Sequence, residues 1–124
     1  MENTKGYRKL LVWHKADQLA FQIYIATRDF PREEIFCLTS QMRRAVLSVP
    51  ANIVEGYARS SEKEKLQFYS ISRGSLAEIE YFIDFSFRLG YILDSQHKNL
   101  INLRDETGRL LTGLIKSLKK RILI

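Results

Sequence analysis

The chain has 124 residues, of which 45% are hydrophobic and 27% charged, and its net charge is +6 at pH 7. This composition is typical of a soluble globular protein, and we expect a single domain over 1–124. No apolar run approaches the roughly 20 residues that a membrane-spanning helix needs, and the polar N-terminus lacks the apolar stretch of a signal peptide. We therefore expect a cytoplasmic protein without a membrane partner.

The single cysteine, Cys37, excludes a disulfide within the chain. Its neighbours Phe36 and Leu38 are apolar, so we expect Cys37 to be a small core residue rather than a nucleophile.

Four segments with helical periodicity follow one another, separated by Phe30-Pro31, Arg59-Ser60-Ser61 and Leu89-Gly90-Tyr91. The pattern predicts helices over about 11–28, 37–58, 62–89 and 95–120. Long helices with short connections favour antiparallel neighbours. The sequence therefore predicts an all-α fold, an up-and-down antiparallel four-helix bundle.

Several residues mark the ends of these helices. Ser61 and Glu64 form the pattern of a capping box at the start of the third helix. Gly90 is placed to follow its last residue, where a left-handed backbone is common. Asp94 or Ser95 is expected to cap the fourth helix.

Two of the predicted core faces are well defined and one has an excess of aromatic residues. The first helix places Ala16, Leu19, Ala20, Ile23 and Thr27 on one face, and the second places Leu38, Met42, Val46, Val49 and Ile53. The expected core stripe of the third helix is Phe68, Ile71, Ser75, Ile79, Phe82, Ser86 and Leu89. Tyr81, Phe85 and Phe87 lie off the centre of that stripe, which favours self-association, although a wide buried face would also accommodate them.

The second helix carries a polar stripe beside its apolar one, formed by Gln41, Arg44, Ala45, Ser48, Asn52, Glu55 and Arg59. Short polar groups in line suit a close helix contact with satisfied hydrogen bonds, and Glu55 can pair with Arg59. We interpret the stripe as a polar seam inside the bundle or between subunits; the alternative is a polar outer face. Pro50 removes one helical donor and crowds the Val46 carbonyl, which predicts a kink or local break.

No pattern of an enzyme site, metal site or cofactor site is present. His14 and His97 have no second histidine or cysteine at ligand spacing, and there is no paired Glu-x-x-His or phosphate-binding glycine loop. We expect a protein that is not an enzyme and holds no metal or cofactor. An enzyme using the polar stripe would need Glu55 close to His14 or His97.

The basic residues are the candidate nucleic-acid contacts, because a basic excess favours polyanionic partners. They cluster near the N-terminus, near the C-terminus and along the second helix and its exit. Because helices one and four have opposite directions, we expect the terminal clusters at opposite ends and the charge to be distributed. The candidates are Arg8, Lys9, Arg43, Arg44, Arg59, Lys63, Lys116, Lys119, Lys120 and Arg121.

Five motifs occur in order: Leu11-Val12-Trp13-His14-Lys15-Ala16, Phe30-Pro31-x-x-Glu34, Leu38-Thr39-Ser40-Gln41-Met42-Arg43-Arg44-Ala45, Ser48-Val49-Pro50-Ala51-Asn52-Ile53-Val54-Glu55-Gly56 and Gly74-Ser75-Leu76-Ala77-Glu78. Over about 9–119 the chain resembles the bacterial four-helix-bundle family named after proteins encoded in intervening sequences of 23S rRNA genes. That family is related to the accessory variability determinant of diversity-generating retroelements. The resemblance implies a ring-forming homo-oligomer, a homopentamer, and it does not imply catalysis. For the retroelement branch it implies binding of RNA or DNA and association with a reverse transcriptase.

Two functions follow as expectations. The first is a non-enzymatic, oligomeric nucleic-acid-binding protein, with RNA favoured over DNA. The alternative is a protein-interaction module, such as an accessory subunit of a retroelement reverse transcriptase, which would use the aromatic residues Tyr81 and Phe85.

Overall fold

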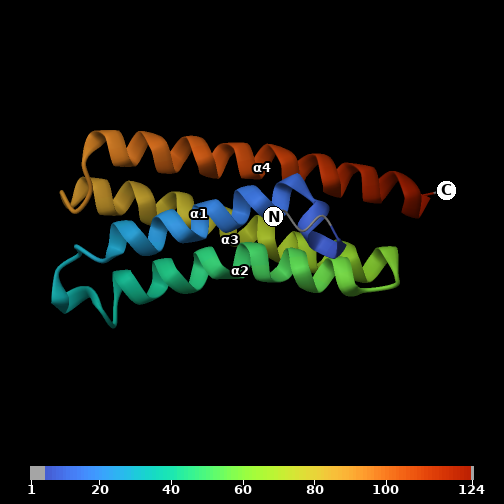
Figure 1. Cartoon of the computed structure of the whole chain (residues 1–124), viewed down its shortest axis with the longest axis horizontal. Coiled ribbons are helices and arrows are strands. Elements are labelled where there is room, and N and C mark those ends of the chain that lie inside the picture. The colour runs from blue at the N-terminus through green and yellow to red at the C-terminus, as the bar shows by residue number, and fades with distance from the viewer. Residues whose placement is uncertain (1–4, 124) are drawn as a thin grey trace.

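The computed structural model describes residues 5–123, and they form four long helices (Figure 1). Helix α1 spans Leu11–Thr27, α2 spans Leu38–Ala58, α3 spans Glu62–Arg88 and α4 spans Asp94–Leu123. Short 3₁₀ helices precede α1 (η1, Gly6–Lys9) and α2 (η2, Arg32–Glu34). No strand occurs in this part of the chain, which confirms the all-α class. None of these helices is both long and apolar enough to cross a membrane.

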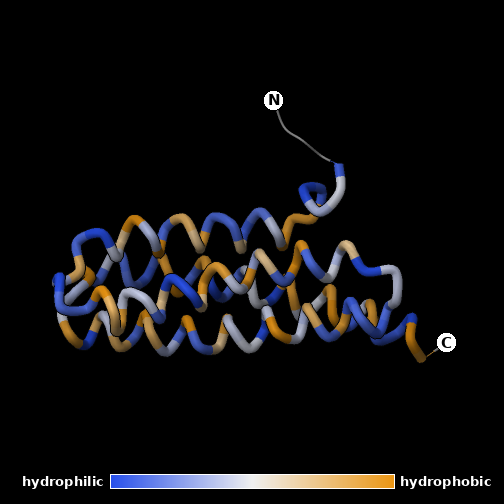
Figure 2. Tube along the Cα trace, turned by 90° about the horizontal axis from the view of Figure 1, so that it is seen from below, coloured by the Kyte–Doolittle hydropathy of each residue, from blue (hydrophilic) through white to orange (hydrophobic). Residues whose placement is uncertain are grey.

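The helices form the predicted up-and-down bundle. Each helix packs against two others: α1 against α2 and α4, and α3 against α2 and α4. Consecutive helices run in opposite directions, so the start of α1 and the end of α4 lie at the same end of the bundle (Figures 1 and 2). Hydrophobic and hydrophilic residues alternate along all four helices in Figure 2, as amphipathic helices around one core require.

The helix ends follow local hydrogen bonds. Ser61 caps α3, because its side-chain oxygen accepts a hydrogen bond from the Glu64 amide at 3.3 Å. Gly90 follows α3 with a φ of 78°, as expected for a glycine after a helix. Helix α4 begins at Asp94, so the prediction that Asp94 or Ser95 precedes it as the cap is wrong. The residue before the helix is Leu93, whose amide donates a hydrogen bond to the side-chain oxygen of Gln96 at 2.7 Å.

The predicted core faces of α1 and α2 are confirmed, because all ten of their residues are buried. The predicted core stripe of α3 is wrong in part. Ile71 is 49% exposed and Leu89 is also exposed, whereas Leu76 has no exposed surface. The buried face of α3 is Tyr69, Ser72, Ser75, Leu76, Ile79, Ile83 and Ser86. This face includes the small hydroxyl residues Ser72, Ser75 and Ser86, which allow α3 to lie close to α2.

Those hydroxyls hold α3 against α2. Ser72 donates a hydrogen bond to the carbonyl of Val49 at 2.8 Å, and Ser75 donates to the hydroxyl of Ser48 at 2.8 Å. Ser86 bonds both its own helix and the sulfur of Met42. Helix α2 continues through the buried Pro50, so the expected local break does not occur, and the kink stays a prediction.

Gly56 gives the closest approach between α2 and α3. A Cβ at this position would lie 2.6 Å from Cε1 of Tyr69, whose ring is buried. We expect Gly56→Ala to lower the free energy of unfolding by about 1–3 kcal/mol, because overpacking exceeds the gain of roughly 1 kcal/mol in helix propensity. Urea denaturation measures the change. Gly113→Ala is the control, since its Cβ would meet nothing within 4 Å, and it should stabilise the protein.

The end of the bundle that carries the α1–α2 and α3–α4 connections is tied together by Tyr91. Its hydroxyl donates to a carboxylate oxygen of Glu34 at 2.8 Å, which raises the pKa of Tyr91, and its ring packs on Phe30. Cys37 lies at this end and is exposed, and Phe36 is 93% exposed. The prediction of a core cysteine is therefore wrong, because the chain turns outwards between η2 and α2.

Candidate nucleic-acid interface

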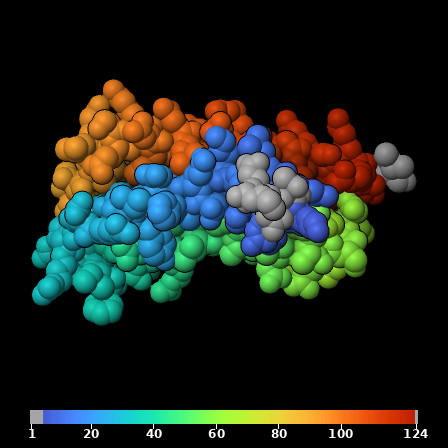
Figure 3. All heavy atoms as spheres, viewed as in Figure 1, coloured from blue at the N-terminus to red at the C-terminus, as the bar shows by residue number. Residues whose placement is uncertain are grey.

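Most of the candidate basic residues meet at one end of the bundle, which we call the basic end. It is formed by η1, the end of α2, the start of α3 and the end of α4, and it lies at the right of Figures 1 and 3. The expectation that the terminal clusters lie at opposite ends is wrong. In an antiparallel pair the start of one helix lies beside the end of the other, so the N-terminal and C-terminal clusters are brought together. The candidates placed here are Arg8, Lys9, Arg59, Lys63, Lys116, Lys119, Lys120 and Arg121.

The basic end accounts for the whole positive excess of the protein. Its segments 5–9, 55–65 and 116–121 contain ten lysines and arginines and three glutamates. This excess is larger than the net charge of +6 of the chain, so the remaining residues carry no net positive charge. A field of one sign at one end attracts polyanions and orients the molecule as they approach.

Aromatic rings are interleaved with the charges. The ammonium groups of Lys9 and Lys65 lie 5.6 and 5.4 Å from the ring centroid of Tyr57, and Lys65 also donates to the Tyr57 carbonyl at 2.9 Å. The guanidinium of Arg59 lies 4.7 Å from the ring centroid of Phe68. Tyr57 and Phe68 therefore hold cations at fixed positions at the surface.

Only part of this charge is neutralised within the described chain. Arg59 pairs with Glu55 at 2.8 Å and Arg121 with Glu62 at 3.1 Å. Within residues 5–123, the four lysines at positions 63, 116, 119 and 120 form no ion pair. Burial raises the pKa of Tyr69. The neighbouring side chains of Tyr57 and Glu62 raise it further, and Arg121 lowers it, so residues of α2, α3 and α4 lie close together here.

The other two candidates, Arg43 and Arg44, do not belong to the basic end. Arg43 turns towards α1, where its Nε donates to the Thr27 hydroxyl at 2.9 Å. Arg44 lines a small pocket of about 160 Å³ between α2 and α3, together with Gln41, Ser48, Ser75 and Glu78.

The residues of the predicted polar seam divide into two groups. Ser48 and Asn52 are half-buried between α2 and α3, and the Asn52 amide donates to both the carbonyl and the hydroxyl of Ser48. Gln41 and Glu55 are exposed. The sequence pattern places Ser86 on the core stripe of the third helix but does not identify Ser72, whose hydrogen bond to the Val49 carbonyl also joins α3 to α2. The small size of Ser72 is the available signal.

Tyr81 and Phe85 lie on the outer side of α3. Their ring centroids are 5.9 Å apart, and Tyr81 has the same separation from Phe82. Tyr81 is exposed and Phe85 is half-buried. The Arg88 guanidinium lies 5.5 Å from the Phe85 ring centroid, and Ile71 is a further exposed apolar residue of the same helix.

Neither histidine bonds to Glu55 in the described part of the chain. His14 contacts the carbonyl of Arg8 at 2.6 Å, and His97 lies 2.8 Å from an oxygen of Asp84 and stacks on Phe87. Residues 5–123 contain no group of three or more His, Cys, Asp or Glu side chains placed to hold a metal ion.

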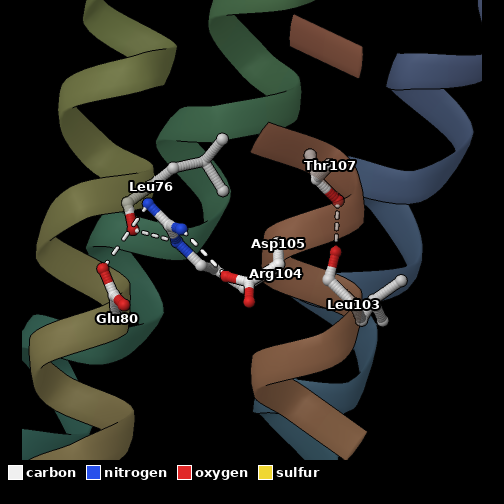
Figure 4. Close-up of polar contacts among 6 residues, drawn as sticks. All are labelled: Leu76, Glu80, Leu103, Arg104, Asp105 and Thr107. Atoms are coloured by element: carbon white, nitrogen blue, oxygen red, sulfur yellow. Dashed lines mark hydrogen bonds and ion pairs between the residues drawn. The ribbon is translucent and has the colours of Figure 1, made fainter. Parts of the chain in front are cut away.

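Among the ion pairs of the described residues, Arg104 has the least exposed side chain. It reaches from α4 to α3, where its Nε donates to the Leu76 carbonyl at 3.0 Å and a terminal nitrogen lies 3.7 Å from Glu80 (Figure 4). Another terminal nitrogen pairs with Asp105 at 3.0 Å. The three partners satisfy the guanidinium in the groove between the two helices.

We expect Arg104→Met to lower the free energy of unfolding by about 1.5–3 kcal/mol, because it removes a charge-assisted hydrogen bond from a side chain that is only 19% exposed. Thermal or urea denaturation measures this. Arg109→Met, on the exposed surface of the same helix, should change it by less than about 0.5 kcal/mol. Equal effects of the two substitutions would contradict the role of the Leu76 contact.

A protein family and a solved structure are similar to this chain. A family model described as 23S rRNA-intervening sequence protein matches residues 8–113. A crystal structure of a protein of unknown function from the S23 ribosomal protein family of Bacteroides thetaiotaomicron is similar, with a TM-score of 0.78 and 25% identity, over 86% of this chain and 96% of that chain. No curated protein matches. The match over most of the length confirms the resemblance read from the motifs: the chain belongs to the family of 23S rRNA-intervening sequence proteins.

Proposed function

We propose that this protein is a non-enzymatic nucleic-acid-binding protein and that the basic end is its binding surface. One observation carries the proposal: the segments that meet there hold the entire positive excess of the chain. Lysine and arginine side chains in such a cluster neutralise backbone phosphates and release counterions, which gives affinity without sequence selectivity. Tyr57 and Phe68, which already lie against cations, add aromatic surface on which unpaired bases can stack.

RNA is the favoured ligand over DNA. The family name refers to 23S rRNA, and the similar crystal structure is assigned to a ribosomal protein family. A basic end with aromatic rings suits single-stranded loops of structured RNA, whose bases are free to stack.

The test is a titration of a fluorescent RNA hairpin, and of a DNA duplex of the same sequence, with the full chain at several salt concentrations. If about six phosphates are contacted, the affinity should fall about a thousandfold between roughly 50 and 200 mM salt. RNA should bind more tightly than DNA at each concentration. Absence of binding at low salt, or binding that does not weaken as salt rises, would contradict an electrostatic mechanism.

Self-association through the outer side of α3 is a second proposal, supported by the exposed side chains of Tyr81 and Ile71 and the half-buried ring of Phe85. Such surfaces on a small protein favour protein contacts. A ring would repeat the basic end around its axis and increase avidity for a long polyanion. Light scattering should give a mass several times 14.5 kDa, and a monomer would refute it.

A further inference from the structure

A second concentration of arginines lies away from the basic end, in a pocket of about 410 Å³ where α1 ends and α2 begins. Arg28, Arg32 and Arg43 line it, from the end of α1, from η2 and from α2. Phe30 and Ile35 supply an apolar wall. This pocket belongs to neither the basic end nor the outer side of α3.

The three arginines have no carboxylate counter-ion among the described residues. Within residues 5–123, none of them forms an ion pair. Asp29 and Glu33 are near in sequence but do not line the pocket. Like charges gathered in a recess repel each other unless an anion lies among them. Glu34 of η2 has other partners, because its oxygens accept hydrogen bonds from the Leu38 amide and the Tyr91 hydroxyl.

Arg43 is oriented before any ligand arrives. Its Nε donates to the Thr27 hydroxyl at 2.9 Å, a terminal nitrogen donates to the Tyr24 carbonyl at 3.4 Å, and the guanidinium lies 4.7 Å from the Tyr24 ring centroid. A guanidinium has five N–H donors. Two hydrogen bonds therefore hold the Arg43 guanidinium in place, and its remaining N–H groups can donate to an oxyanion.

Thr39 supplies a separate observation at the same place. It lines the pocket, it is only 6% exposed, and its hydroxyl is the one buried side-chain oxygen or nitrogen in the described residues without a hydrogen-bond partner. A threonine inside a helix usually bonds a carbonyl three or four residues earlier, but Thr39 is the second residue of α2 and that backbone is not helical. The hydroxyl of this pocket-lining residue therefore has a hydrogen bond to donate that no group of the described chain accepts.

We propose that this pocket is a binding site for a phosphate group, held by Arg28, Arg32 and Arg43 with Thr39 as an additional donor. Arginine pairs with phosphate oxygens through two parallel N–H bonds, which a recess with several arginines at its wall can offer from different directions. The apolar wall formed by Phe30 and Ile35 suits the organic part of a small phosphate ester.

The experiment is calorimetric titration of the full chain with inorganic phosphate and with a nucleoside monophosphate. We expect saturable binding that Arg28→Gln and Arg32→Gln each weaken at least tenfold, since each removes charge-assisted hydrogen bonds. Arg88→Gln, an exposed arginine outside the pocket, should leave it unchanged. No saturable binding, or equal binding by the Arg28→Gln, Arg32→Gln and unmodified proteins, would overturn the proposal.

Two further arms sharpen the result. Thr39→Val keeps the shape of the side chain and removes a hydroxyl without a partner, so the protein should be at least as stable and bind phosphate several-fold more weakly. Unchanged affinity would contradict the role of the hydroxyl.

The affinity of a short RNA with a 5′-phosphate is compared with that of the same RNA ending in a hydroxyl. Tighter binding of the phosphorylated RNA that is lost in Arg32→Gln assigns the pocket to a strand terminus. Equal affinities assign it to a free phosphate ester.

Discussion

Replacing Lys116, Lys119 and Lys120 of α4 with glutamine is expected to weaken RNA binding about 100-fold at roughly 0.1 M salt. Each lost phosphate contact reduces the steepness of log affinity against log salt by about 0.7–0.9. At that concentration this lowers the affinity about fivefold or more. The slope itself should fall by two to three. All three side chains are exposed, so the fold should be retained. Fluorescence anisotropy across a salt series measures both quantities.

The matched control removes the same charge elsewhere. Arg73, Arg88 and Lys98 are exposed residues of α3 and α4 outside the basic end, and their replacement with glutamine changes the net charge equally. This variant should keep most of the affinity and nearly the full slope. An equal loss in both variants would mean that overall charge, not the basic end, attracts the RNA.

Leu76→Ala is expected to lower the free energy of unfolding by about 2–5 kcal/mol. Leu76 is fully buried in the core cluster, and truncation of such a side chain loses both its transfer free energy and its packing contacts. Ile71→Ala, on the same helix, removes an apolar side chain that is half exposed, and it should cost less than about 1 kcal/mol. Urea denaturation of both variants gives the comparison.

Comparison of Leu76→Ala with Ile71→Ala tests directly which face of α3 is buried in the bundle. If Ile71→Ala were the more damaging substitution in the monomeric protein, α3 would present the face that its hydrophobic pattern alone predicts. If Ile71→Ala reduced self-association while leaving monomer stability unchanged, the outer side of α3 would be the contact surface between copies.

The error in α3 has a physical origin. A helical wheel weighted by hydrophobicity centres on the large apolar residues, here Phe68, Ile71 and Phe82. The face that packs is instead determined by how closely α2 and α3 approach, and that approach needs small residues such as Ser72 and the gap at Gly56. Pairwise packing of this kind is not encoded in one helix alone. On α1 and α2 the buried faces coincide with the apolar stripes, so the wheel was sufficient.

Other features were local enough to be predicted. The cap at Ser61 depends on residues within one turn, and Gly90 depends on its own backbone conformation. The basic residues were identified as candidates, but their convergence depends on the order of the helices and was misjudged. Thr39 and Arg28 carry no signal in sequence, because what marks them is the pocket formed where α1 and α2 meet.

Cross-linking from the two ends of the bundle tests the central claim most directly. Cys37 is the only cysteine, it is exposed, and it lies at the end opposite the basic end, so a short photo-cross-linker attached there reports on RNA at that end. Ser117→Cys in a Cys37→Ser background carries the same group among the lysines of α4. We predict that an RNA ending in a 5′-hydroxyl, which brings no terminal phosphate to the arginine pocket near Cys37, cross-links efficiently from position 117 at low salt and poorly from Cys37. Cross-linking that is equal at both positions, or stronger from Cys37, would contradict the assignment of the basic end as the nucleic-acid interface.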